Sequence, residues 1–210
     1  TIVASPATSS PVAYRRRAFP WREPPHPLLQ HRLPAGASDA AEATTFRSPA
    51  AGAMHALVAD HVVRARVVLP GAAYLELARA AWCALASPSP PPTGAAQLRG
   101  VFFLQPLALE ASGGLHVECA VAAGGRFEVR SGDPGRSGGG ALVDPAVHCT
   151  GAMMAAAAGA SWARVDLAST RAAVGQRAES VAALYDAFDA AGLQYGPGYR
   201  ALLHAWGGGG

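Results

Sequence analysis

The clearest pattern of hydrophobic positions follows the dipeptide Pro70-Gly71. Apolar residues recur there at spacings of three and four, which is the period of an α-helix. These positions are Tyr74, Leu75, Ala78, Ala81, Trp82 and Leu85. Apart from Glu76 and Arg79 the segment is apolar or alanine, so we expect a helix that is enclosed on most of its sides. The proline-rich stretch SPSPPPTG ends it.

Short apolar or β-branched runs bounded by Pro and Gly predict β-strands. The stretches HPLLQHRL and EATTFRSP are of this kind, and QLRGVFFLQPLAL predicts a buried pair of strands. LHVECAV and RFEVRSG predict a hairpin across AAGG, with these residues alternating inward: Leu115, Val117, Cys119 and Val121. A further strand is expected around residues 147–150. One apolar helix with several antiparallel strands is an α+β plan in which a sheet wraps a helix.

The last part of the chain changes character. VAALYDAFDAAG predicts an amphipathic helix that carries Leu184, Tyr185 and Phe188 and is ended by Gly192. The following LQYGPGYRALLHAW predicts a turn that leads into a strand. We therefore expect an inter-domain linker at 1–25, an α+β domain at 26–165, a linker with a helix at 166–191 and the start of a second unit at 192–210.

Composition and charge narrow the classes of function. Half of the 210 residues are hydrophobic and the net charge is only +3. All 17 basic residues are arginine, and outside Arg15-Arg16-Arg17 they are scattered, which disfavours a nucleic-acid binder. No apolar run reaches the ~18 residues that a membrane helix needs, and the N-terminus lacks the apolar core of a secretory signal. We expect no membrane association.

The three cysteines, Cys83, Cys119 and Cys149, form no C-x-x-C pair. Widely spaced cysteines in odd number are typical of reduced, buried thiols, so we expect a cytoplasmic protein. The sequence reads as a segment of a longer protein.

The seven histidines include one with an unusual setting. Most fit turns or the surface, and His148 fits a core or edge strand position; no pair has the spacing of a helical metal site, so we predict no metal. His61 instead heads the run VVRARVVL that ends at Pro70-Gly71. Apolar neighbours can keep such an imidazole neutral and ready to take a proton. The N–H groups at the helix start near Gly71 can stabilise a carbonyl oxygen that gains negative charge.

The spacing alone leaves a catalytic and a structural role for this histidine equally open. The stretch ADHVVRARVVLPGAAYLELARAA, however, resembles the N-terminal active-site motif H-x-x-x-G-x-x-x-x-P of dehydratase domains in modular polyketide synthases and animal-type fatty acid synthases. His61 and Pro70 match this motif. Ala65 replaces its glycine, and we expect this change to tighten the turn after His61.

Three more stretches resemble that family, in the family's order. HPLLQHRLP is similar to the opening of the domain, and AVHCTGAMM is similar to the last strand of its first half. GLQYGPGY resembles the motif G-Y-x-Y-G-P-x-F that opens the second half, with Leu193 and Tyr199 as substitutions. Upstream, VAYRRRAFPW is similar to the linker after an acyltransferase domain.

The resemblance implies a fold and a set of roles. The fold would be the first half of a double hotdog, in which each half is a long helix wrapped by an antiparallel sheet and the active site lies between the halves. His61 would be the general base that removes the α-proton of a β-hydroxyacyl thioester, and the Gly71 N–H would polarise its carbonyl. The implied substrate-binding residues are Pro70, Gly71, Tyr195, Gly196 and Pro197.

The resemblance also implies partners. The family's second catalytic residue, an aspartate on the central helix of the second half, would lie beyond residue 210, so we expect this fragment alone to be inactive. The substrate would arrive on the phosphopantetheine of an acyl carrier protein, with no cofactor bound to this chain directly. Expected partners are that carrier protein, the neighbouring synthase domains and the C-terminal hotdog half.

Two alternatives stay open. One is a non-catalytic hotdog module with a structural or acyl-binding role. The other is a related hotdog enzyme, either a product-template domain or a thioesterase.

Overall fold

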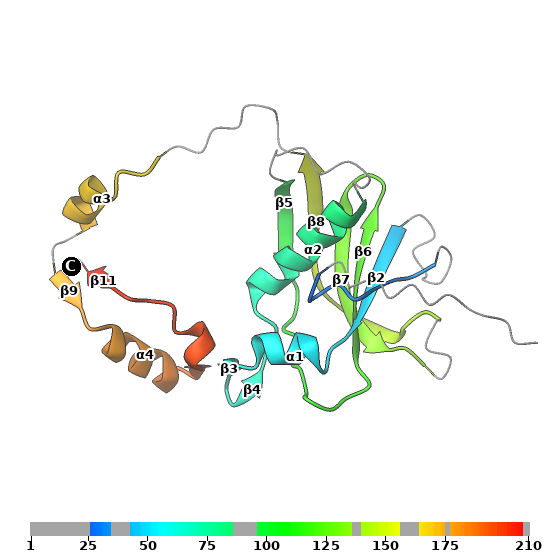
Figure 1. Cartoon of the computed structure of the whole chain (residues 1–210), viewed down its shortest axis with the longest axis horizontal. Coiled ribbons are helices and arrows are strands. Elements are labelled where there is room, and N and C mark those ends of the chain that lie inside the picture. The colour runs from blue at the N-terminus through cyan, green and yellow to red at the C-terminus, as the bar shows by residue number, and fades with distance from the viewer. Residues whose placement is uncertain are drawn as a thin grey trace, which may run out of the picture.

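The described part of the chain is built around one antiparallel sheet. The computed structural model describes residues 26–34, 43–85, 96–135, 140–155, 164–174 and 177–207. The sheet has six strands in the order β1-β2-β6-β7-β8-β5 (Figure 1). In chain order they are β1 (His31–Arg32), β2 (Ala43–Pro49), β5 (Ala96–Phe103), β6 (His116–Ala122), β7 (Arg126–Asp133) and β8 (Val143–Ala155). The expected linker at 1–25 lies outside the described residues.

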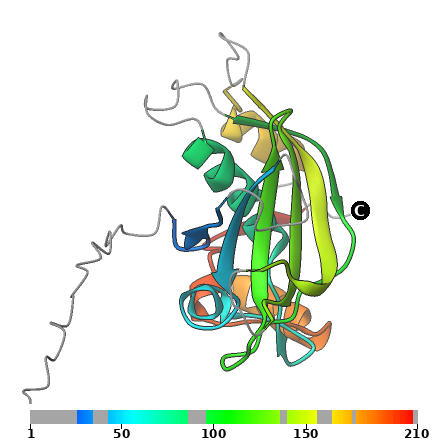
Figure 2. The ribbon, with the colours of Figure 1, turned by 90° about the vertical axis from the view of Figure 1, so that its right-hand side faces the viewer.

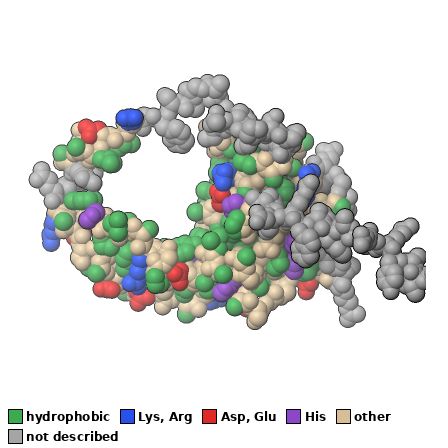
Figure 3. Space-filling view, in the orientation of Figure 1, with side chains coloured by type: hydrophobic (Ala, Val, Ile, Leu, Met, Phe, Trp, Pro, Cys, Tyr) green, Lys and Arg blue, Asp and Glu red, His purple; other side chains and the backbone are tan. Residues whose placement is uncertain are grey.

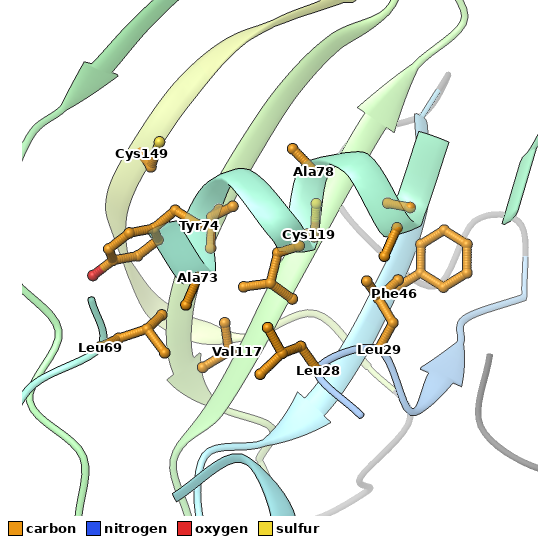
Figure 4. Close-up of a cluster of buried hydrophobic side chains, with 14 of the residues drawn as sticks. Leu28, Leu29, Phe46, Leu69, Ala73, Tyr74, Ala78, Val117, Cys119 and Cys149 are labelled. Atoms are coloured by element: carbon orange, nitrogen blue, oxygen red, sulfur yellow. The ribbon is translucent and has the colours of Figure 1, made fainter. Parts of the chain in front are cut away.

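Helix α2 (Gly71–Leu85) packs on one side of this sheet (Figure 2). Its buried residues are Ala73, Tyr74, Leu77, Ala78, Ala80 and Ala81. Side chains from the strands, among them Phe46, Val117 and Cys119, meet them in one core (Figure 4). Each fully buried large aliphatic side chain stabilises such a core by about 1.5–3 kcal/mol.

The expected helix is confirmed in position but not in its burial. Gly71, Ala72 and Arg79 are exposed, so the helix is buried on one face rather than on most sides. The reason is that alanines all round a helix permit a second covering layer without requiring one.

The hairpin of β6 and β7 is confirmed, with Val121 paired to Phe127 at the turn end. Val117, Cys119 and Val121 are buried in the core, and Leu115 is partly buried against it. Glu118 and Ala120, which point the other way, are buried as well. The strand expected around residues 147–150 is the middle of the longer strand β8.

The prediction of a buried strand pair in QLRGVFFLQPLAL was wrong. The stretch forms one strand, β5, at the sheet edge beside β8, and both Phe102 and Phe103 are more than half exposed. Pro106 follows, and a residue without an N–H does not continue a strand ladder. The chain beyond β5 instead accepts the Leu69 N–H at the Leu107 oxygen over 2.8 Å.

A buried ion cluster lies on the sheet face opposite α2. Arg47, Glu118 and Arg130 are cross-strand neighbours on β2, β6 and β7. One Glu118 oxygen accepts Nε–H of Arg47 at 2.8 Å, and the other accepts Nε–H of Arg130 at 2.8 Å. Glu118 is fully buried. Hydrophobic alternation predicted the inward face of these strands but gave no sign of this cluster.

Shorter elements complete the described structure. Beside the large sheet lie α1 (Ala53–Val58), β3 (His61–Val63) and β4 (Arg66–Val67). The later elements are α3 (Leu167–Val174), β9 (Arg177–Glu179), α4 (Val181–Ala190), β10 (Leu193–Tyr195), the 3₁₀ turn η1 (Pro197–Tyr199) and β11 (Ala205–Gly207). Strand β10 joins β3 and β4 in a three-stranded sheet, and β9 pairs with β11. The division of the chain at residues 165 and 191 stays a prediction.

Two surface properties bear on the excluded classes. Over the described residues, no helix is both long enough and apolar enough to cross a membrane. On the face shown in Figure 3, basic and acidic side chains are interspersed among apolar and neutral ones.

Candidate active site

His61 opens strand β3, which turns directly into β4. Its Nδ1 lies 2.7 Å from the backbone oxygen of Val68. Because a carbonyl oxygen only accepts hydrogen bonds, we assign the proton of the neutral ring to Nδ1, and Nε2 then keeps its lone pair. The residue is half-buried. The hairpin backbone therefore fixes the ring and leaves its basic nitrogen on the other side.

The turn after His61 has an unusual backbone. Arg64 and Ala65 have φ values of 48° and 62°, the left-handed region that two-residue hairpin turns of this kind require. The Arg64 N–H donates to the Gly192 oxygen at 2.8 Å, and the Ala65 N–H donates to Oε1 of Gln194 at 2.7 Å. An L-residue pays about 1–2 kcal/mol in this region, which explains why the resembled motif has glycine at position 65. Ala65 is thus held in place by the neighbouring strand.

That neighbouring strand brings two tyrosines to His61. Strand β10 pairs antiparallel with β3, with Tyr195 opposite His61. The Tyr195 ring centroid lies 5.6 Å from that of His61, and the Tyr199 centroid lies at 5.4 Å. The two tyrosine rings are nearly parallel, 6.5 Å apart. Together they form an aromatic wall beside the imidazole.

Asp60, the residue before His61, holds the turn that carries this wall. Its backbone oxygen accepts the Gly196 N–H at 2.8 Å, and its Oδ2 accepts the Gly198 N–H at 2.7 Å. Pro197, exposed between these two glycines, begins η1. No local sequence pattern indicates this role for Asp60.

Pro70 and Gly71 lie at the start of α2. Pro70 is half-buried and Gly71 is exposed. A Cβ added at Gly71 would lie 3.6 Å from the Phe103 ring, so an apolar side chain stands beside the helix N-terminus. The helix N-terminus there carries the positive end of the helix dipole, and the Ala73 N–H donates to the Pro70 oxygen at 2.9 Å. The apolar stretch that contains Phe103 predicts a buried strand, so the sequence gives no sign of this place for Phe103.

Two tyrosines near these segments have raised pKa values. Burial raises the pKa of Tyr74 to about 12, although its hydroxyl oxygen accepts the Leu107 N–H. Burial also raises the pKa of Tyr199, and the neighbouring Asp60 carboxylate raises it further. Both phenols are therefore protonated at neutral pH.

His148 is a core residue, as its strand context predicted. Its ring is buried, with Nδ1 3.2 Å from the Gln105 oxygen and Nε2 2.7 Å from Oγ of Ser131. These partners make Nδ1 the donor and Nε2 the acceptor of the serine hydroxyl. Burial lowers the His148 pKa.

Other possible sites are few. The described residues contain no group of three or more His, Cys, Asp or Glu side chains that could hold a metal ion. A groove of about 550 Å³ lies on the outer sheet face, with lining residues that include Arg99, Arg126 and Thr150 but not His61. The lining residues of this groove do not include Tyr195 or Tyr199 either.

The structure thus brings together part of the predicted set. His61, Tyr195 and Gly196 meet through the β3–β10 pairing and the Asp60 backbone. Pro70 and Gly71 are placed by a different contact, that of Leu69 with Leu107. An imidazole nitrogen with a free lone pair beside an aromatic wall can accept a proton from a bound ligand.

Comparisons of the sequence with known proteins find polyketide synthases. The sequence profile of the polyketide synthase dehydratase domain matches residues 26–132. The polyketide synthase ThaG of Burkholderia thailandensis is 37% identical over 153 residues, which cover 71% of this chain and 3% of that protein. GfsE, a polyketide synthase of Streptomyces halstedii, is 29% identical over 220 residues, covering 92% of this chain and 5% of that protein. The chain therefore spans a small part of these large relatives.

Solved dehydratase domains share the fold. The dehydratase domain from the CurF module of the curacin polyketide synthase matches with a TM-score of 0.71 at 22% identity, covering 86% of this chain and 62% of that one. A trans-AT polyketide synthase dehydratase domain from Brevibacillus brevis matches with a TM-score of 0.68 at 26% identity, covering 87% and 61%. This chain spans a little under two thirds of each.

Proposed function

The chain belongs to the polyketide synthase dehydratase domains, and from this premise we propose that it supplies the general base of such a domain. The reaction is loss of water from a β-hydroxyacyl thioester to give the α,β-enoyl thioester. The observation that carries the proposal is the setting of His61. Its Nδ1 is engaged with the Val68 oxygen, its Nε2 keeps a lone pair, and two tyrosine rings stand beside it.

The proposed chemistry moves one proton to the enzyme. Nε2 of His61 takes the α-proton while the C–H electron pair shifts toward the thioester carbonyl. The Gly71 N–H, at the positive end of α2, stabilises the negative charge on the carbonyl oxygen. The electron pair then forms the carbon–carbon double bond as the β-carbon–oxygen bond breaks, and the hydroxyl leaves as water after protonation by an acid.

The remaining predicted site residues fit the same picture as binding groups. Pro70 sets the start of the helix, and Tyr195 with Gly196 and Pro197 forms the wall of the acyl channel. We assign the acid to an aspartate outside residues 1–210, and we expect this fragment alone to be inactive. Inactive mutants of the CurK dehydratase, one with Phe replacing a His and one with Asn replacing an Asp, support a histidine–aspartate pair as the basis of this proposal.

The proposal extends to fold and partners. The sheet with α2 is the first hotdog of a double hotdog, and a second hotdog completes the pocket. The substrate arrives on the phosphopantetheine of an acyl carrier protein, neighbouring domains of the same synthase supply it, and no cofactor binds this chain directly. The setting is the cytoplasm.

The test is a dehydration assay on the complete dehydratase domain of the parent synthase. His61→Ala should lower kcat/KM for a β-hydroxybutyryl N-acetylcysteamine thioester by about 10²- to 10⁴-fold, because the general base is lost. His55→Ala is the matched control, since His55 is another half-buried histidine, on the short helix α1. It should leave the rate unchanged.

The products separate the alternatives. The enoyl thioester is expected, whereas a cyclised product would indicate a product-template role and a free acid a thioesterase. Unchanged dehydration in His61→Ala would refute the assignment of the base. A wild-type domain that binds the acyl thioester but forms no product would support the non-catalytic module instead.

A further inference from the structure

Asp60 makes two contacts to one short turn. Its backbone oxygen accepts the Gly196 N–H, and its carboxylate accepts the Gly198 N–H over 2.7 Å. The two acceptors of a single residue therefore hold both glycines that flank Pro197. The carboxylate that lies next to the base in sequence is committed to the backbone of another segment.

The two segments approach each other most closely at the glycines of the turn. A Cβ added at Gly196 would overlap the Asp60 carboxylate, and one added at Gly198 would lie 2.9 Å from Oδ2. Neither glycine has a positive φ, so the closeness of Asp60, and not the backbone conformation, favours glycine here. At Gly196 the Asp60 Cβ lies only 2.8 Å from the added atom, whereas at Gly198 only the carboxylate end would have to shift. The turn from Gly196 to Gly198 thus packs closely against the Asp60 side chain.

The two tyrosines of the wall depend on different supports. Tyr195 lies in β10 and is set opposite His61 by strand pairing. Tyr199 lies one residue beyond Gly198, in η1, where its N–H donates to the Gly196 oxygen at 3.0 Å. The position of the Tyr199 ring therefore follows the turn that Asp60 holds. His61 itself is held by Val68 and does not depend on the Asp60 carboxylate.

We propose that Asp60 is a positioning residue for the proposed dehydration: its carboxylate fixes the turn from Gly196 to Tyr199, so that the Tyr199 ring stands beside His61 as one half of the acyl wall. This rests on the proposed function. We assign Asp60 no acid role, because the proposed acid belongs to the second half of the domain and Oδ2 of Asp60 accepts the Gly198 N–H. Its effect is on substrate placement rather than on the base.

The kinetic test uses the complete dehydratase domain and the β-hydroxybutyryl N-acetylcysteamine thioester. Asp60→Ala removes the acceptor for Gly198 and should lower kcat/KM about tenfold, mostly through KM, because a hydrogen bond to a charged group is lost while His61 is unchanged. Asp60→Asn keeps an acceptor oxygen and should stay within about threefold of the wild type. Asp186→Ala, which removes an exposed carboxylate on α4, is the control and should change nothing.

Three kinetic outcomes would overturn the proposal. An unchanged Asp60→Ala domain would show that the turn needs no carboxylate. If kcat/KM of the Asp60→Asn domain fell as far as that of Asp60→Ala, the negative charge of Asp60, and not its hydrogen bond to Gly198, would be what the reaction needs. A fall in kcat with constant KM would place Asp60 in the chemical step.

A structural test on the 210-residue chain works without any activity. Nuclear Overhauser contacts between the His61 and Tyr199 rings should disappear in Asp60→Ala and persist in Asp60→Asn. Contacts between His61 and Tyr195 should persist in both variants, which also shows that they fold. The pKa of Tyr199 should fall in both, since each removes the negative charge that disfavours the phenolate.

The two tests separate the two proposals. If His61→Ala retains dehydration, the proposed function fails whatever the Overhauser contacts show. If the Tyr199 contact survives in Asp60→Ala, the positioning role fails even when His61 is the base.

Discussion

The sheet region (residues 26–155) and the C-terminal segment (residues 164–207) are held together by different means. The sheet region has a continuous core in which α2 packs on strands from β2 to β8. In the described part of the C-terminal segment, Tyr185 is the only buried hydrophobic residue, whereas Leu203 is 82% exposed. The first region is stabilised mainly by burial of apolar surface, and the second by strand pairing, a helix cap and single hydrogen bonds.

The candidate active site lies where these two regions meet. His61 and its Val68 partner belong to the sheet region, whereas Tyr195 and Tyr199 arrive on β10 and η1. The proposed base is therefore fixed by a well-packed unit, and the aromatic wall beside it is fixed by a few polar contacts. Changes in the first region should show as loss of stability, and changes in the second as loss of geometry.

The largest effect is expected from the buried ion cluster. Glu118→Ala should lower the free energy of unfolding by about 3–5 kcal/mol, because Arg47 and Arg130 lose the carboxylate buried between them. Urea denaturation followed by circular dichroism would measure this.

Glu128→Ala is the matched control for this change. Glu128 lies 3.9 Å from the same Arg130, but its side chain is 40% exposed, so its ion pair is worth at most about 1 kcal/mol. Equal losses in Glu118→Ala and Glu128→Ala would refute the claim that burial makes the cluster important.

The same leucine truncation in the two regions tests the comparison directly. Leu77→Ala in α2 should cost about 2–5 kcal/mol, since it leaves a cavity at a position that is 2% exposed. Leu203→Ala should cost less than about 0.5 kcal/mol. Thermal unfolding of both variants measures the difference, and similar midpoints would mean that the C-terminal segment is covered in solution.

Much of the sheet region could be predicted from the sequence because its signals are local. The helix over 71–85 follows from its period of three to four and from Pro70-Gly71, and the β6–β7 hairpin follows from alternation around AAGG. His61 lies at the start of β3, before a tight turn, and its catalytic role stays a prediction.

The contacts that complete the site could not be predicted because they are not local. Glu118 interrupts an apolar run, and only the pairing of three strands shows that two arginines neutralise it. Asp60 directly precedes His61 in the sequence, yet its hydrogen-bond partners are Gly196 and Gly198, far along the chain. Local patterns give elements, whereas strand order decides which polar side chains meet.

Stability should depend on pH through His148. Burial lowers its pKa below the ordinary value of 6.5, so below pH 6.5 the unfolded chain binds a proton that the folded chain does not. The stabilising contribution is complete above pH 6.5 and is lost as the pH falls, by up to about 1.4 kcal/mol per pH unit. Urea midpoints between pH 5 and pH 8 measure it.

A substitution isolates this histidine from the others. His148→Gln should be less stable than the wild type at every pH but should show a flatter decline below pH 6.5. His55→Gln, the same change at a half-buried histidine on α1, is the comparison variant. An unchanged slope in His148→Gln would assign the pH dependence to other groups.

The smallest effect is expected in the turn after His61, between β3 and β4. Ala65→Gly should raise the free energy of unfolding by about 0.5–1 kcal/mol. Glycine removes the cost of a left-handed alanine, about 1–2 kcal/mol, and the greater entropy of the unfolded glycine chain offsets about 0.5–1 kcal/mol of that gain. Ala187→Gly in α4 changes the same atoms in a helical backbone and should lower stability by about 0.5–1 kcal/mol. Opposite signs in thermal unfolding would show that the backbone at position 65 is strained. A loss of stability in both variants would mean instead that the backbone at Ala65 is not strained.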